Sequence, residues 1–493
     1  MKLVVPDALL RDNRLTRYSY LVATLAAVLL LRRAKDSSIP RENMIGVAAS
    51  LVPTELSHKV LLLNAFAIYY VHKAKVPVLS GWSGSIGGLL HALALVKLSS
   101  MYATNVKARL AIRAAMQEQT DIPIAKLRRI GAMNWKRWLS VLLPLPQPLA
   151  LSLSFPGVRR IRTVTYAHVG KLKTTKLLMD VYKHDTNAQP NAPILLYIHG
   201  GGWVIGNRML PPLPLVYQLA SAGWVVCSID YRLSPMVTFP SHVIDSKRAI
   251  AYLRKYAQAK FDADPNFIVV GGESAGGHIA SLVALTPHVK LLQPGFEDVD
   301  TSVRACIDSY GVHDFTDRHG IYYNRDKADG FIKYLEFLVM QKKLRDHAED
   351  FENASPIAWL EADKTQDRRD IVPPFLVTHG TFDTLVPFQD SKLFYEKLIK
   401  YRARTQALQG SGASTAGVRD AFLQIDGAHH MFNYLVSPRA LAHGDAVCAF
   451  LDDLYSKTKH LPLSARFPRS TENEQVEEEP PVAAAFAPVV AKL

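Results

Sequence analysis

The sequence predicts an α/β fold with a mostly parallel central sheet flanked by helices, preceded by an N-terminal helical region associated with membrane. Three observations point to it. Short apolar runs alternate with helical stretches after residue 158, the central runs lack alternating polar residues, and the first 140 residues hold long uncharged runs. A strand without polar alternation is typically buried on both faces, as in a parallel sheet covered by helices. With 493 residues, 48% of them hydrophobic, the chain can form a large core.

The predicted strands are short runs rich in β-branched and aromatic residues. In order they are IRTVTYA, LLMDVY, ILLYI, WVVCSI, FIVVG, RACIDSY, PFLVTHG and AFLQID, at residues 161–167, 177–182, 194–198, 224–229, 267–271, 304–310, 374–380 and 421–426. The stretches 245–260 and 389–402 supply crossover helices. Residues 315–365 are a long, charged insertion between two strands, which we expect to form a cap-like segment near the functional site.

The excess positive charge lies in the N-terminal region. The chain has a formal net charge of +14, and residues 1–140 hold 20 Lys and Arg against 7 Asp and Glu. These basic residues flank apolar runs at 18–31, 60–71 and 76–96, and the last run, with about 21 residues, is long enough to span a bilayer. Basic residues beside apolar runs are typical of membrane proteins, whereas a nucleic-acid binder needs a basic face on a folded domain.

The first apolar run is predicted to be a retained anchor, because Arg-Arg-Ala-Lys follows it where the cleavage site of a signal peptide needs small residues. The basic stretch 107–137 then places the rest of the chain on the cytosolic side by the positive-inside rule. The alternative is that residues 18–96 form the core of a soluble helical domain, since single runs are short or contain Pro and His.

Composition divides the remainder into three parts. Residues 141–157 are predicted to be a linker, and residues 158–459 the α/β domain. Residues 460–493 carry clustered glutamates and are expected to be a disordered acidic tail. The tail ends in Ala-Lys-Leu, which is similar to a Ser-Lys-Leu peroxisomal signal. We prefer a membrane location, in the endoplasmic reticulum or plasma membrane, because a chain anchored near its N-terminus is not delivered as soluble cargo.

Two glycine-rich motifs predict a nucleophilic serine with an oxyanion hole. The segment GESAG follows the run FIVVG and precedes a helical run, which is the strand–turn–helix setting of a nucleophile elbow at Ser274. The segment HGGGW follows ILLYI. Its bare glycine backbone lets amide N–H groups point into a site, where they could join that of Ala275 in an oxyanion hole. A phosphate-binding P-loop would need Gly-Lys-Ser or Gly-Lys-Thr, which HGGGW lacks.

The general base and its carboxylate partner are predicted downstream. Asp383 comes just after the strand PFLVTHG, and His430 comes just after the last strand. Loops at the carboxyl ends of parallel strands meet at one edge of a sheet, so these residues can lie beside Ser274. Two alternatives stay open: His429 in place of His430, and Asp314 in place of Asp383.

These motifs, with DYRLSP, the following FP, Asp245 and the segment GAHHMF, resemble those of hormone-sensitive-lipase-like carboxylesterases of the α/β-hydrolase fold, over residues 175–455. The resemblance implies that Ser274 is the nucleophile, His430 the base and Asp383 its orienting carboxylate. It also implies an oxyanion hole made by Gly200, Gly201 and Ala275. The spacing G-x-x-H-x-F selects His430, although the paired histidines depart from the family pattern.

We therefore expect a membrane-associated serine hydrolase that cleaves carboxylic esters, lipid-like ones in particular, through an acyl-enzyme. An amidase or peptidase on the same triad, or a non-catalytic ligand-binding protein on this fold, are the alternatives. Three scattered cysteines exclude a disulfide framework and a thiolate zinc site. We expect no metal and no cofactor, and the expected partners are the ester substrate and a membrane, with no nucleic acid.

Overall fold

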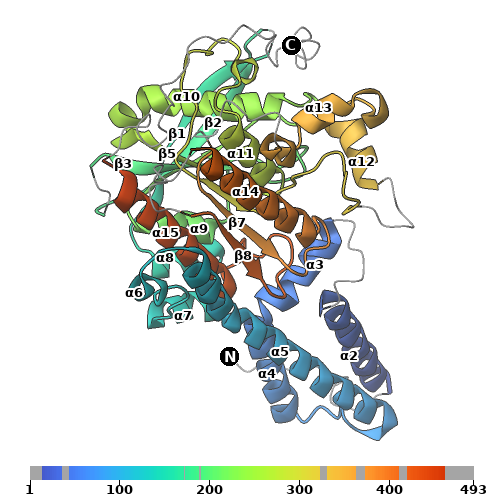
Figure 1. Cartoon of the computed structure of the whole chain (residues 1–493). Helices are drawn as coiled ribbons and strands as arrows, with labels where there is room; N and C mark the ends of the chain where they lie inside the picture. The colour runs from blue at the N-terminus through green and yellow to red at the C-terminus, as the bar shows by residue number, and fades with distance from the viewer. Residues whose placement is uncertain are drawn as a thin grey trace.

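One eight-stranded sheet organises the chain (Figure 1). The computed structural model describes residues 14–35, 44–170, 172–187, 190–322, 330–361, 372–409 and 419–460. The strands run in the order β1-β2-β4-β3-β5-β6-β7-β8. The pairs β1–β2 and β2–β4 are antiparallel, and every pair from β4–β3 to β7–β8 is parallel. The predicted tail at 461–493 lies outside the described residues, as do 323–329 and 362–365 of the predicted insertion.

Each predicted strand is present. The strands are β1 (Val158–Val169), β2 (Thr175–His184), β3 (Ala192–Ile198), β4 (Val225–Ile229), β5 (Ala263–Glu273), β6 (Cys306–Ser309), β7 (Phe375–Gly380) and β8 (Ala421–Ile425). Every residue of β3, β4, β6 and β7 is buried, which confirms that the runs without polar alternation are covered on both faces.

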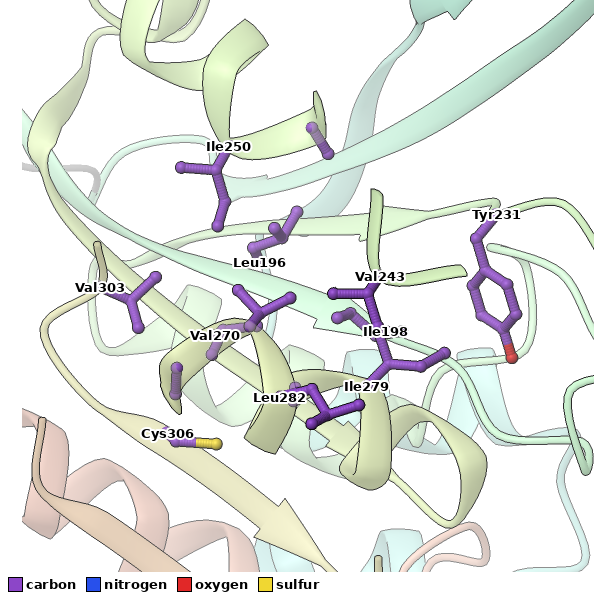
Figure 2. Close-up of a cluster of buried hydrophobic side chains, with 14 of the residues drawn as sticks. Leu196, Ile198, Tyr231, Val243, Ile250, Val270, Ile279, Leu282, Val303 and Cys306 are labelled. Atoms are coloured by element: carbon purple, nitrogen blue, oxygen red, sulfur yellow. The ribbon is translucent and has the colours of Figure 1, made fainter. Parts of the chain in front are cut away.

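Helices cover both faces of the sheet. The helices α10 (Ser241–Phe261), α11 (Ala275–Leu285) and α14 (Phe388–Gln409) share one apolar cluster with the sheet, and Figure 2 shows Leu196 and Val270 in it beside Ile250 and Leu282. The helices α9 (Leu213–Ser221) and α15 (Pro438–Thr458) contribute to the cluster on the other face. This strand order with helices on both faces is the α/β-hydrolase fold, as the sequence predicted.

The predicted N-terminal region is helical. It contains α2 (Arg14–Lys35), α3 (Met44–Glu55), α4 (Ser57–Lys73), α5 (Gly81–Gln119), α6 (Ile124–Leu127), α7 (Trp135–Leu142) and α8 (Gln147–Ser154). The segment expected to be a linker is folded, because α8 buries Ala150 and Leu151. The residues described contain two helices long and apolar enough to cross a membrane, 14–34 and 81–119.

Helix α5 belongs to two environments. Its first half lies with α2 and α4 in a group that projects from the body of the molecule (Figure 1). Tyr20 Oη, His91 Nδ1 and Nε2, and Asn64 Oδ1 link the three helices through contacts of 2.9 and 3.0 Å. Its second half buries Ile112 and Met116 in the same cluster as α9 and α15. The N-terminal region is therefore continuous with the core that covers one face of the sheet.

The projecting group exposes large apolar side chains. They include Leu15, Val22 and Leu30 on α2, Leu62, Leu63, Phe66 and Tyr69 on α4, and Trp82, Leu89 and Val96 on α5, each more than half exposed. Large exposed apolar patches on a folded protein typically mark a site of contact with protein or membrane. The alternative that residues 18–96 are a buried core does not match their exposure.

The described parts of the insertion are short helical turns. They are α12 (Gly330–Tyr334), η2 (Leu335–Val339), η3 (Leu344–Asp346), α13 (Ala348–Asn353) and η4 (Pro356–Leu360), while η1 (Lys290–Leu292) lies before β6. Tyr334 Oη donates a hydrogen bond of 2.7 Å to the carbonyl oxygen of Gly202, so the insertion touches the loop after β3.

Candidate active site

Ser274 occupies the tight turn between β5 and α11. Its backbone has φ 55° and ψ −123°, a left-handed conformation that non-glycine residues adopt under constraint, and the residue is 9% exposed. A Cβ on Gly276 would overlap the carbonyl oxygen of Ile198, and one on Gly272 would overlap that of Gly276. Small residues on either side of the serine are therefore required for α11 to pack this closely on β3. The predicted strand–turn–helix setting is present.

Asp383 and His430 are brought together from the loops after β7 and β8. Asp383 Oδ2 accepts a hydrogen bond of 2.6 Å from His430 Nδ1, and Asp383 Oδ1 accepts from the N–H groups of Leu385 and Val386 at 2.9 and 3.0 Å. Burial by itself would raise the pKa of Asp383, but the charge and hydrogen bond of His430, with those of His379, outweigh it and lower this pKa. An ionised carboxylate thus holds the ring of His430.

Tyr310 connects His430 to the serine turn. Its ring lies 4.6 Å from the ring of His430 between centroids, and its hydroxyl donates a 2.5 Å hydrogen bond to Asn433 Oδ1. The preceding residue, Ser309, accepts the N–H of Ser274 through its carbonyl oxygen at 3.0 Å. The ends of β5, β6, β7 and β8 therefore place the predicted nucleophile, base and carboxylate at one edge of the sheet.

The structure corrects the predicted role of Gly200. The N–H of Gly200 donates to Glu273 Oε1 at 2.9 Å, so this group is already bonded and does not face a substrate. Gly201 and Gly202 both have positive φ, at 116° and 58°. Within the described part of the chain, no acceptor pairs with the N–H groups of Gly201, Gly202 or Ala275. The sequence did not single out Gly202, because a run of three glycines does not reveal which amides are left unpaired.

Glu273 is a second residue that sequence reasoning missed. Its buried carboxylate accepts hydrogen bonds from the Gly200 N–H, from Tyr197 Oη on β3 and from Tyr434 Oη in the loop after β8. Burial raises its pKa to about 7, although these three hydrogen bonds oppose the shift. The available signal was the carboxylate inside GESAG, next to the nucleophile.

His199 contacts the backbone of the loop after β3. Its Nδ1 lies 2.7 Å from the carbonyl oxygen of Gly200, and its ring stacks on Tyr231 with centroids 4.3 Å apart. Burial lowers the pKa of His199 to about 4, so the ring is neutral at pH 7. Asp230, near Tyr231, is held by Arg208 at 3.0 Å.

The two alternatives from the sequence lie elsewhere. His429 faces backbone carbonyls with both ring nitrogens: Nδ1 lies 2.8 Å from Phe382 O and Nε2 lies 2.6 Å from Ala34 O. Asp314 accepts from Thr316 and Arg318 in its own loop. The structure pairs His430 with Asp383. Neither His429 nor Asp314 takes part in this pair. In the described ranges, no group of three or more His, Cys, Asp or Glu could hold a metal ion.

The α/β-hydrolase fold, with Ser274, Asp383 and His430 at the carboxyl ends of its strands, is the basis for comparison with known proteins. A family model described as BD-FAE matches residues 179–398, a segment with Ser274 and Asp383 that ends before His430. The esterase LipQ of Mycobacterium tuberculosis is 34% identical over 281 residues, which are 57% of this chain and 60% of LipQ. The chain thus spans less than two thirds of the length of that relative.

Two further comparisons extend the list of similar proteins. The isoprenylcysteine alpha-carbonyl methylesterase ICME of Arabidopsis thaliana is 26% identical over 331 residues, which are 64% of this chain and 72% of ICME. Among solved structures, an esterase of Thermogutta terrifontis aligns with 61% of this chain and 94% of its own chain, at a TM-score of 0.45 and 23% identity.

The contact between His430 and Asp383 predicts which histidine is essential. The change His430→Ala should lower kcat by about four to six orders of magnitude, because it removes the predicted general base. The change His429→Ala should cost far less, because this ring faces two backbone carbonyls. Ester hydrolysis by the two purified variants decides between them. An inactive His429→Ala with an active His430→Ala would reverse the assignment.

The raised pKa of Glu273 predicts a pH-dependent stability. Because the pKa of Glu273 is higher in the folded protein than its ordinary value of 4.5, protonation of this group favours folding. Its contribution to the free energy of unfolding is fully present below pH 4.5 and is lost as the pH rises to about 7. The thermal midpoint of the wild type should therefore fall more steeply between pH 4.5 and 7 than that of Glu273→Gln. The exposed Glu349, changed to Gln, is the matched control and should follow the wild type. Parallel curves for Glu273→Gln and the wild type would contradict this expectation.

Proposed function

We propose that the chain is a carboxylic ester hydrolase that works through an acyl-enzyme on Ser274. The observation that carries this proposal is the 2.6 Å hydrogen bond between His430 and Asp383, on loops that end beside a serine held in a nucleophile elbow. The similarity to LipQ and to ICME, both named as esterases, supports ester chemistry over an amidase or a peptidase. The HGGGW and GESAG motifs support a place among the hormone-sensitive-lipase-like carboxylesterases, which they resemble.

In the proposed first step, Ser274 Oγ attacks the ester carbonyl carbon and His430 Nε2 takes its proton. The ionised Asp383 stabilises the imidazolium that forms and fixes the ring with Nε2 toward the serine. The N–H groups of Gly201, Gly202 and Ala275 donate hydrogen bonds to the oxyanion, so Gly202 takes the place first assigned to Gly200. His430 then gives its proton to the leaving alcohol oxygen.

In the second step, water attacks the acyl-enzyme. His430 removes a proton from this water, the same three N–H groups hold the second oxyanion, and the carboxylic acid leaves as Ser274 Oγ regains its proton. The neutral His199 and the carboxylate of Glu273 keep the donor loop in place during both steps, through the carbonyl and the N–H of Gly200.

We further propose that the substrate is a lipid-like ester met at a membrane surface. The support is the exposed apolar surface of α2, α4 and the first half of α5, together with the basic residues that flank these helices. ICME is named for a prenylated cysteine ester, which is a lipid-like ester of this kind. On this proposal residues 1–140 are the membrane-associated part, and residues 158–459 are the catalytic domain on the cytosolic side.

A fluorophosphonate probe tests the nucleophile. The probe should label the full-length protein in detergent, and Ser274→Ala should abolish both labelling and the hydrolysis of p-nitrophenyl esters of short to long acyl chains. Ser281, a buried serine on α11, is the matched control, and Ser281→Ala should keep its label. Folded wild-type protein that takes no label would favour a non-catalytic binding protein.

Vesicle binding tests the membrane surface. The triple change Leu63→Glu, Phe66→Glu and Leu89→Glu places charges on side chains that are 66%, 65% and 76% exposed, and it should release the protein from vesicles into the supernatant. The control is Leu172→Glu, on the turn between β1 and β2, at a side chain 84% exposed. Equal vesicle binding by the triple variant and the wild type would refute the assignment of this surface.

A further inference from the structure

A buried carboxylate from the N-terminal helices lies beneath the loop that carries His430. Glu55, at the end of α3, is fully buried. Its Oε2 accepts hydrogen bonds of 2.9 Å from Asn105 Nδ2 on α5 and from Ser437 Oγ, and its Oε1 pairs with Arg439 Nη1. A charge buried this deeply is costly unless each of its oxygens is paired, and both oxygens of Glu55 are.

Arg439 passes this contact on to the loop after β8. It lies in the first turn of α15 and is 1% exposed. Besides binding Glu55, its guanidinium donates to the carbonyl oxygens of Gly427 at 3.3 Å and Asp426 at 3.2 Å. These two residues begin the segment that ends at His430 and Phe432. The planar guanidinium therefore ties the start of the histidine loop to a carboxylate of the N-terminal region.

A second contact from the N-terminal region reaches the same loop. The ring of His429 lies between Ala34 O, in the last turn of α2, and Phe382 O, next to Asp383. A cavity of about 270 Å³ separates these contacts, and its lining includes Ala34, Met101, Phe382 and Arg439. These hydrogen bonds and the ion pair add to the apolar packing of the same loop, in which Ala428 and Phe432 share a buried cluster with Ile112 of α5.

We propose that Glu55 is a positioning residue for His430 that acts through Arg439, so that the N-terminal helices take part in building the active site. The inference rests on the proposed function, in which His430 is the base. Glu55 compensates the charge of Arg439, and Arg439 fixes the carbonyls that set where the loop starts. A loop free to shift by about 1 Å would misplace the base, and such a shift can cost about 100-fold in rate.

The sharpest variant is Arg439→Lys in the full-length protein in detergent. Lysine keeps the positive charge beside Glu55 but lacks the fork that reaches two carbonyls as well as the carboxylate. We expect kcat to fall by about 10- to 100-fold, with KM within about twofold.

The chain offers a matched control at the opposite end of the same strands. Arg402 pairs with Asp420 at 2.8 Å and donates to the carbonyl oxygens of Val372 and Pro373 at 2.6 Å each. Asp420 in turn accepts the N–H of Phe375, which begins β7. Arg402→Lys thus removes the same kind of fork away from His430, and it should leave kcat unchanged even if it lowers the thermal midpoint.

Hydrogen–deuterium exchange of residues 421–437 supplies a readout independent of activity. Arg439→Lys and Glu55→Gln should both raise exchange in this segment, and Arg402→Lys should not. Equal kcat and equal exchange for Arg439→Lys and Arg402→Lys would overturn the positioning role while leaving the esterase proposal intact. A wild type that hydrolyses no ester, with exchange that responds as expected, would instead defeat the proposed function.

Discussion

The buried carboxylate of Glu273 is the constraint around which the active edge is assembled. It is one residue from Ser274, and it accepts hydrogen bonds from the loop after β3, from β3 itself and from the loop that carries His430. Taking a carboxyl group out of water is unfavourable unless donors surround it, so the three loops must converge for the fold to form. The turn at Ser274, the loop after β3 and the loop that carries His430 are thus held together by one buried side chain.

Much of this edge could be predicted from the sequence, because motif order and strand ends already fix which residues meet. Ser274, Asp383 and His430 each follow a strand, and parallel strands bring such residues to one edge. Gly200 was assigned wrongly because the direction of its N–H depends on the backbone of the loop and on where the Glu273 side chain lies. The pair Glu55–Arg439 could not be predicted, since its members lie 384 positions apart and no local pattern links them.

The N-terminal region shows a second limit of sequence reasoning. Charge and apolar runs predicted a membrane-associated helical region, and its helices do expose apolar side chains. The same runs also suggested an anchor separate from the rest of the fold. Helix α5 instead exposes Leu89 and Val96 in its first half and buries Ile112 and Met116 against the body of the fold. Both halves are apolar. Composition alone does not distinguish an apolar face that stays exposed from one that packs against α15.

Because α5 is one continuous helix of 39 residues, it acts as a rigid strut between its two environments. At 1.5 Å per residue it extends about 58 Å, and it permits no free rotation of one end against the other. Through such a helix, the sheet and its flanking helices keep one fixed angle to α2 and α4, which a flexible linker would not impose. Each residue gained or lost within it would turn the two ends by about 100° relative to each other. The length of α5 consequently fixes both the distance and the rotation between the projecting helices and the sheet.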